Sequence, residues 1–227
     1  VRGVNTITQP LTADLGKSLT FKGGLSTVIG YGDFDPTSTS NIFELSCETP
    51  VHGAQFKFES LILRNAGNFA VNVINATDIT VIDCLFENNG WSGEGLTLNA
   101  AASGDTLGFD STQAELTAFN NLSASSGGAI NINTGLNITI DDNIIRSGNK
   151  NINLIDVGFA EPVDLPVVPG VVNIRNNQIT NNLDHGINFD TRNAVLSTGI
   201  QSTRDGSRNV NVSNNSIRDN GGDGIRV

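Results

Sequence analysis

The sequence predicts an all-β protein whose chain is wound into stacked coils. The segment from Val172 to Phe189 returns almost position by position at residues 210–227. Looser copies of the same pattern begin at Phe56, Ile79, Leu116 and Ile138. Self-similarity of this kind indicates a solenoid, in which each repeat buries its apolar side only against its neighbours.

Each copy begins with a short strand followed by a bend. Apolar residues occupy the first and third positions, as in Ile138 and Ile140, and this period of two predicts a strand with one buried face. Position six, at the bend, is occupied down the copies by Leu61, Cys84, Asn121, Asn143, Asn177 and Asn215. Asparagine tolerates the left-handed conformation, and its amide bonds nearby backbone groups. We therefore expect Asn143, Asn177 and Asn215 to point into the bend and to bond neighbouring coils.

A second short apolar run follows the bend, and a third strand then closes the coil. The inward residues of the third strand are expected to be Val71 and Val73, Leu96 and Leu98, Ile130 and Ile132, Ile152 and Leu154, Ile187 and Phe189, and Ile225 and Val227. Their intervening neighbours would point outward, because side chains alternate along a strand.

The spacing of the copies predicts where extra residues are inserted. First positions fall at residues 19, 56, 79, 116, 138, 172 and 210, and the longer repeats hold insertions at 99–115, 156–171 and 190–209. All three insertions would follow the third strand. Insertions at one phase of a coil project from one side, so we expect them to form a rim that carries a binding surface.

On the inner-strand and asparagine-bend pattern, residues 19–227 resemble the right-handed parallel β-helix (pectate lyase-like) superfamily. It includes pectate lyases, polygalacturonases, mannuronan C5-epimerases, phage tailspikes and many bacterial surface proteins, and the chain is closest in character to the last group. The resemblance implies a right-handed single-stranded parallel β-helix with insertions on one side. A β-sandwich is the competing fold, but it would not repeat asparagine at one phase.

Composition limits the function classes. The chain has 227 residues, 37% of them hydrophobic, which fits one domain over 1–227, and its start and end inside strand-like segments suggest a fragment of a longer protein. A net charge of −10 argues against nucleic acid as a partner. No apolar stretch is long enough to span a bilayer. The polar composition favours an extracellular or cell-surface location.

Neither a cofactor nor a disulfide is expected. A polyanionic glycan would need calcium to bridge its carboxylates to this acidic chain, but no calcium motif is present beyond one short Gly-Asp-Gly turn. Cys47 and Cys84 would lie two layers apart, about 10 Å at ~4.8 Å per layer, which is beyond bridging reach. We expect two free, buried thiols.

One patch could carry chemistry. Alignment of the third strands places Phe69, Glu94, Gly128, Lys150, His185 and Asp223 in one column just before the strand. A histidine between a cation and a carboxylate can serve as general acid or base. In a catalytic interpretation, His185 would transfer the proton, Asp190 or Asp223 would orient it, and Arg226 with Arg192 would neutralise a uronate carboxylate. In a structural interpretation, the column is only the solvated face of a β-helix.

A second candidate surface is the outward row of amides. Asn131, Asn153 and Asn188, together with Arg192, form a polar face that could bind glycan hydroxyls. Polar residues must cover the solvent side of any sheet, and identical amides stack in register, so such a row needs no ligand to explain it.

The resemblance to the enzymes of the superfamily is incomplete. The tripeptide Asp184-His185-Gly186 is similar to the Gly-His-Gly of polygalacturonases, but their paired aspartates, Asn-Thr-Asp and Arg-Ile-Lys elements are missing. The sequence therefore favours a β-helical stalk or passenger segment that binds a glycan or a partner. A polysaccharide lyase, epimerase or glycoside hydrolase is the alternative, and a trimeric tailspike segment is a third.

Overall fold

The protein is all-β in the part of the chain that the structure describes. A computed structural model describes residues 3–14, 18–24, 26–32, 40–47, 54–90, 127–146, 148, 150–155, 159–160, 168–182, 184–190 and 209–226. These residues form twenty strands and no helix. Accordingly, the described residues contain no helix that is long and apolar enough to cross a membrane.

The strands fall into three series that recur in the same order. The first series comprises β3 (Leu19–Lys22), β6 (Gln55–Glu59), the C-terminal parts of β8 (Phe69–Ile82) and β10 (Gly128–Asp141), β15 (Val171–Arg175) and β18 (Asn209–Ser213). All of its pairings are parallel, and their register joins residues 19, 56, 79, 138, 172 and 210 in one row.

The second series is a parallel sheet of seven short strands. They are β1 (Val4–Ile7), β4 (Val28–Tyr31), β7 (Ile62–Arg64), β9 (Leu85–Glu87), β11 (Ile144–Arg146), β16 (Gln178–Thr180) and β19 (Ser216–Arg218). The third series comprises β2 (Leu11–Asp14), β5 (Phe43–Ser46), the N-terminal parts of β8 and β10, β12 (Lys150–Ile155), β17 (Ile187–Asp190) and β20 (Ile225–Arg226). The separate hairpin of β13 (Phe159–Ala160) and β14 (Val168–Pro169) is antiparallel.

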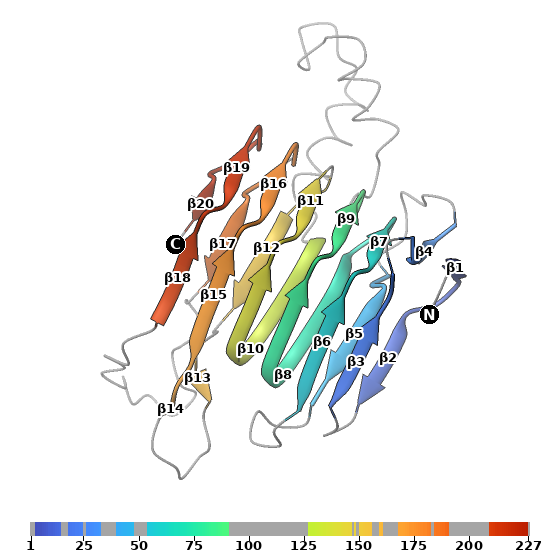
Figure 1. The fold of residues 1–227 in the computed structure, drawn as a ribbon, viewed down its shortest axis with the longest axis horizontal. Helices are drawn as coiled ribbons and strands as arrows, with labels where there is room; N and C mark the ends of the chain where they lie inside the picture. The colour runs from blue at the N-terminus through green and yellow to red at the C-terminus, as the bar shows by residue number, and fades with distance from the viewer. Residues whose placement is uncertain are drawn as a thin grey trace, which may run out of the picture.

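Successive coils follow one another along the long axis of the molecule, from the N-terminal strands to the C-terminal ones (Figure 1). The repetition of three strands with parallel pairing at every level is compatible with the solenoid that the sequence predicts. The expected inward residues Val71, Ile130, Ile152 and Ile187 are all fully buried, whereas in the last described coils Phe189 is half-buried and Ile225 is 45% exposed.

The core changes character along the stack. Near the N-terminus, Phe21 stacks on Phe58 with ring centroids 5.2 Å apart, and Phe43 lies 5.1 Å from Phe58 in an edge-on arrangement. Further along, isoleucine, leucine and valine line the interior. Each apolar row is buried only when the coil before it and the coil after it are both in place.

From residue 60 onward, the described first and second bends of the coils use a residue with positive φ. In the first bend these residues are Ser60, Asp83, Asp142, Asn176 and Asn214, with φ between 54° and 58°. In the second bend they are Asn65, Asn88, Asn181 and Asp219, with φ between 54° and 62°. Asparagine and aspartate tolerate this region better than most residues. The left-handed residue of the first bend thus directly precedes position six, and the side chain at position six fills the interior of the bend.

The structure corrects the expected coil at Leu116. Ile79 is the direct ladder partner of Ile138, and Phe69 is the partner of Gly128, so no coil lies between these strands. The expected third strand at Leu96 and Leu98, the expected first strand at Leu116, and Asn121 all lie outside the described residues. The prediction failed because local alternation of apolar residues does not show whether a segment belongs to the stack.

The positions of the insertions also differ from the prediction. Residues 156–170 and 191–208 connect a third strand to the next first strand, as expected, whereas residues 91–126 connect β9 of the second series to β10. A Cβ added to Gly90 would lie 2.2 Å from the carbonyl carbon of Gly127, so the chain leaves and rejoins the coil at one point. The three connections therefore follow strands of two different series.

The residues before 19, which lie outside the repeats that the sequence predicts, also pair in the stack. In β1, Val4 pairs with Val28, and in β2, Leu11 pairs with Phe43. Both strands have the register of a further coil, and the solenoid pattern therefore begins before residue 19.

Candidate functional site

Buried asparagines join the coils at the first bend, as the sequence predicts. The side-chain oxygen of Asn177 accepts hydrogen bonds from the backbone N–H of Asn143 at 3.0 Å and from its amide at 2.9 Å. The oxygen of Asn215 accepts the same pair from Asn177, both at 2.9 Å. The Asn143 and Asn177 side chains are buried and Asn215 is half-buried. These amides satisfy backbone groups that would otherwise be unpaired inside the bend.

A second ladder at the second bend was not foreseen. The Asn182 amide donates to the Asn220 oxygen at 2.7 Å, and the Asn182 oxygen accepts from the backbone N–H of Gly148 at 3.1 Å. In an earlier coil, the Asn89 oxygen accepts from the N–H of Ala66 at 3.0 Å. The signal was available, because each of these asparagines lies five residues after position six of its copy.

The outward amides form a third ladder along the third-series sheet. Asn131 donates to Asn72 at 2.8 Å, Asn153 donates to Asn131 at 2.7 Å, and Asn188 donates to Asn153 at 2.8 Å. The predicted binding residues Asn131, Asn153 and Asn188 are thus in one continuous row. Asn153 is only 8% exposed, and the other two are half-buried.

All amides of this outward ladder point the same way. Their N–H groups are directed towards the N-terminal end, where Glu44 is the register neighbour of Asn72. Their carbonyl groups are directed towards the C-terminal end, where Arg226 is the neighbour of Asn188. A carboxylate at the donor end and a guanidinium at the acceptor end both complement the aligned amide dipoles.

His185 lies where the two last described coils meet, and contacts surround its ring. The backbone N–H of Asp223 donates to Nδ1 at 2.8 Å, and the Asp223 carboxylate is 3.7 Å from the same atom. Nε2 lies 3.2 Å from the carboxylate of Asp184 and 2.9 Å from Nη1 of Arg226. Only 12% of the side chain is exposed.

The contacts define the role of Nδ1, which accepts the Asp223 N–H. At Nε2, the Asp184 carboxylate calls for a ring N–H, whereas the Arg226 guanidinium, which can only donate, calls for a lone pair. A Cβ added to Gly222 would approach Nδ1 to 2.6 Å, so the glycine is needed for the chain to pass over the ring. Neither nitrogen offers a free lone pair to a substrate. The arrangement can hold two coils together, and proton transfer would require Arg226 or Asp223 to move.

The predicted catalytic residues are only partly brought together. Arg226 and Asp223 contact His185, whereas Asp190 lies at the end of β17, five residues along the chain, or roughly 16 Å along an extended strand. The side chains of Asp190 and Lys150, and all of Glu94 and Arg192, lie outside what the structure describes. Sequence reasoning missed Asp184, although it directly precedes the histidine.

The cysteines are free and buried, as predicted. Burial raises the pKa of the Cys84 thiol to about 12, so the thiol is protonated at neutral pH and serves as a small apolar residue. Cys84 occupies position six of its coil, and its backbone N–H donates to the Asn143 oxygen at 3.0 Å. It thus continues the column that the buried asparagines form.

Within the described residues, no group of three or more His, Cys, Asp and Glu side chains is placed to hold a metal ion. Comparison with known proteins adds no family to this geometry: no family model, curated protein or solved structure matches the chain.

Proposed function

We propose that this chain is a right-handed parallel β-helix of the pectate lyase-like type that serves as a stalk or passenger segment of a secreted or cell-surface bacterial protein. The observation that carries the proposal is the set of three amide ladders, which link coil to coil through side chains. Such links add lateral stiffness to a stack that backbone pairing already holds together. A stiff rod suits a protein that presents a surface at a distance from its anchor.

The ligand face would be the outer side of the third-series sheet. Asn131 and Asn188 are half-buried, and each donates one N–H within the ladder, which leaves its second N–H for a sugar hydroxyl. The surface is regular along the stack axis, which fits an extended polysaccharide. The chain's negative charge favours a neutral glycan over a polyuronate.

Binding to a panel of neutral and acidic glycans tests the ligand. We expect neutral chains to bind weakly, and Asn131→Ala with Asn188→Ala to lower the affinity by roughly threefold to tenfold, the equivalent of one or two hydrogen bonds. Asn173→Ala, on the outer face of the first-series sheet, is the matched control and should bind normally. Absence of binding by the wild-type chain, or equal loss in the control, would reject the amide face as the glycan site.

The alternative function is that of a polysaccharide lyase, epimerase or glycoside hydrolase, and the contacts of His185 with Asp184, Asp223 and Arg226 favour keeping it. The test is depolymerisation of pectate, alginate and neutral glycans by the wild type and by His185→Ala. Activity lost in the variant supports this site, and activity that survives moves catalysis elsewhere. No activity on any polymer, with the fold intact by circular dichroism, supports the stalk. A stable trimer in solution would instead favour the tailspike alternative.

A further inference from the structure

Among the described residues, Ile144 and Val171 are the two large exposed apolar side chains that lie outside the first and last coils. Large exposed apolar residues occur mainly in the first and last described coils, at Val4, Leu11, Val210 and Ile225. Ile144, in contrast, is 40% exposed on the outer face of the seven-stranded sheet. Ladder pairing places it in one row with Leu85 and Ile62, which are half-buried. We call Ile62, Leu85 and Ile144 the aliphatic row.

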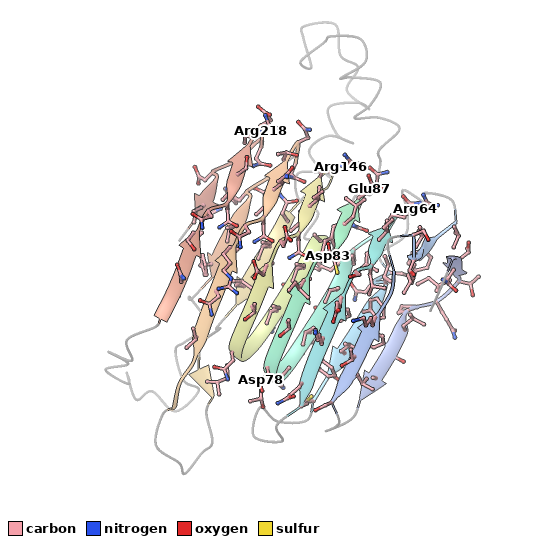
Figure 2. All side chains as sticks on the ribbon, viewed as in Figure 1. Arg64, Asp78, Asp83, Glu87, Arg146 and Arg218 are labelled. Atoms are coloured by element: carbon pink, nitrogen blue, oxygen red, sulfur yellow. The ribbon has the colours of Figure 1, made fainter. Side chains whose placement is uncertain are left out.

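Charged rows of opposite character flank the aliphatic row. A groove of about 260 Å³ runs along the first bend and includes the aliphatic row on one side, and its other side is lined by Ser60, Asp83, Asp142 and Asn176 in successive coils. On the opposite flank of the aliphatic row, the register aligns Arg64, Glu87, Arg146, Thr180 and Arg218. Figure 2 shows Arg64, Glu87, Arg146 and Arg218 along one margin of the sheet and Asp83 further inside. Glu87 is ion-paired with Arg146, so the margin keeps a net positive charge.

We propose that this face docks a second copy of the chain, side by side and with the two stack axes parallel. A rotation of 180° about an axis along the stack exchanges the two flanks and keeps each coil at its own level. The aliphatic row of each copy then meets that of the other, and the arginine margin lies over the side of the groove that holds Asp83 and Asp142. At one level, Asp142 of each copy faces Arg146 of the other.

The antiparallel alternative lacks this complementarity. A rotation of 180° about the strand direction leaves each flank opposite itself, so that Asp83 and Asp142 face aspartates and the arginines face arginines. Like charges opposed at an interface cost free energy. The charge pattern therefore selects the parallel dimer.

The dimer should be weak. Seven strands at ~4.8 Å spacing and a face three to four residues wide give a contact on the order of 400 Å² per copy, about half of a standard interface. We expect a dissociation constant in the micromolar range, so that the fraction of dimer rises with concentration, and a weaker affinity as salt screens the charges.

Sedimentation equilibrium of the whole chain tests the association. The wild type should form a concentration-dependent dimer, and Ile144→Glu should weaken it roughly tenfold or more, because two carboxylates would be buried against each other. Val171→Glu is the matched control, since Val171 is 38% exposed at the start of β15, outside this face. A wild-type chain that stays monomeric at high concentration overturns the proposal, as does a dimer that Ile144→Glu leaves unchanged while it folds normally by circular dichroism.

Single-cysteine cross-linking tests the orientation. In the parallel dimer every residue near the axis meets its own counterpart, so that Ile62→Cys and Gln178→Cys should each form an intermolecular disulfide under mild oxidation. An antiparallel dimer can bring at most one of these two levels onto its axis. Thr139→Cys, on the first-series face, should not cross-link, and the native thiols are buried. Cross-linking at only one level, or equally at Thr139→Cys, overturns the parallel arrangement.

Discussion

The coils before residue 90 and those after residue 127 build the same first bend with different side chains. Ser60 and Asp83 in the earlier coils have φ of 55° and 54°, and Asn176 and Asn214 in the later coils have 58° and 56°. The residue that fills the bend is Leu61 in an early coil and Asn177 in a late one, and both are buried. The backbone geometry is therefore independent of whether the filler is apolar or polar.

What differs is how each half is stabilised. The earlier coils concentrate aromatic side chains, with Phe21, Phe43 and Phe58 in mutual contact. The later coils have smaller aliphatic residues inside and buried amides at both bends. A parallel stack needs a filled interior and paired backbone groups. Aromatic packing in the earlier coils and aliphatic packing with buried amides in the later coils both meet these requirements.

The largest effect should come from breaking the aromatic cluster. Phe58 is fully buried between Phe21 and Phe43, and Phe58→Ala would remove its packing and leave a cavity. We expect the free energy of unfolding to fall by about 3–5 kcal/mol. Urea unfolding followed by circular dichroism measures it. A loss below that of the Asn177 variant described next would mean that the aromatic packing is not the main support of the earlier coils.

Breaking the buried ladder should cost less. Asn177→Ala or Asn177→Leu removes hydrogen bonds to Asn143, to Asn215 and to the carbonyl oxygens of Ile140 and Arg175. Leaving these buried groups unpaired should cost about 1–3 kcal/mol. The surface control Asn173→Ala should stay within about 0.5 kcal/mol of the wild type in the same urea unfolding experiment. Equal stability of the two variants would contradict a structural ladder.

A substitution at the junction of the two halves should have a smaller effect. Cys84 lies between Leu61 and Asn143 in the position-six column, and its N–H already bonds the Asn143 oxygen. Cys84→Asn would extend the buried ladder by one layer, and we expect stability to change by no more than about 1 kcal/mol. Thermal unfolding against the wild type measures the change. A large loss would show that the earlier coils accept only an apolar filler.

The smallest effect concerns one ion pair in each half. The Lys22 and Lys57 ammonium groups, 2.5 and 2.6 Å from Glu59, lower the pKa of its carboxyl to about 2. Asp141 and Arg175 form a 2.9 Å pair in the same row of the later coils. Because the folded pKa of Glu59 lies below its ordinary value of 4.5, the pair stabilises the fold above pH 4.5 and this contribution is lost as pH falls towards 2.

Urea midpoints of the wild type and of Glu59→Gln measure this dependence. The wild type should be slightly more stable at pH 6, and the two proteins should converge near pH 2. The difference should be small, because the pair lies on the surface and is screened by solvent. A difference that persists unchanged at pH 2 would assign it to packing instead of charge.

Much of this fold could be predicted from the sequence because its signals are local. The alternation of Ile138 with Ile140 identifies a strand, and the recurrence of Asn143, Asn177 and Asn215 at one phase identifies a bend and its ladder. Four of the expected register steps, 19 to 56, 56 to 79, 138 to 172 and 172 to 210, are confirmed by pairing. In a repeat protein the register of strand pairing can be predicted from the sequence, because each residue pairs with the equivalent residue of the next repeat.

Only the tertiary structure decided which segments join the stack and which groups meet at its corners. Ile79 pairs with Ile138 across 59 residues, and no local pattern shows that the chain in between is skipped. Asp184 and Arg226 converge on one nitrogen of His185 although they come from different coils, and the direction of each side chain at a bend depends on backbone angles. Sequence periodicity specifies what alternates along a strand. The pairing of strands is a contact between residues far apart in the sequence, and it specifies which strands are neighbours.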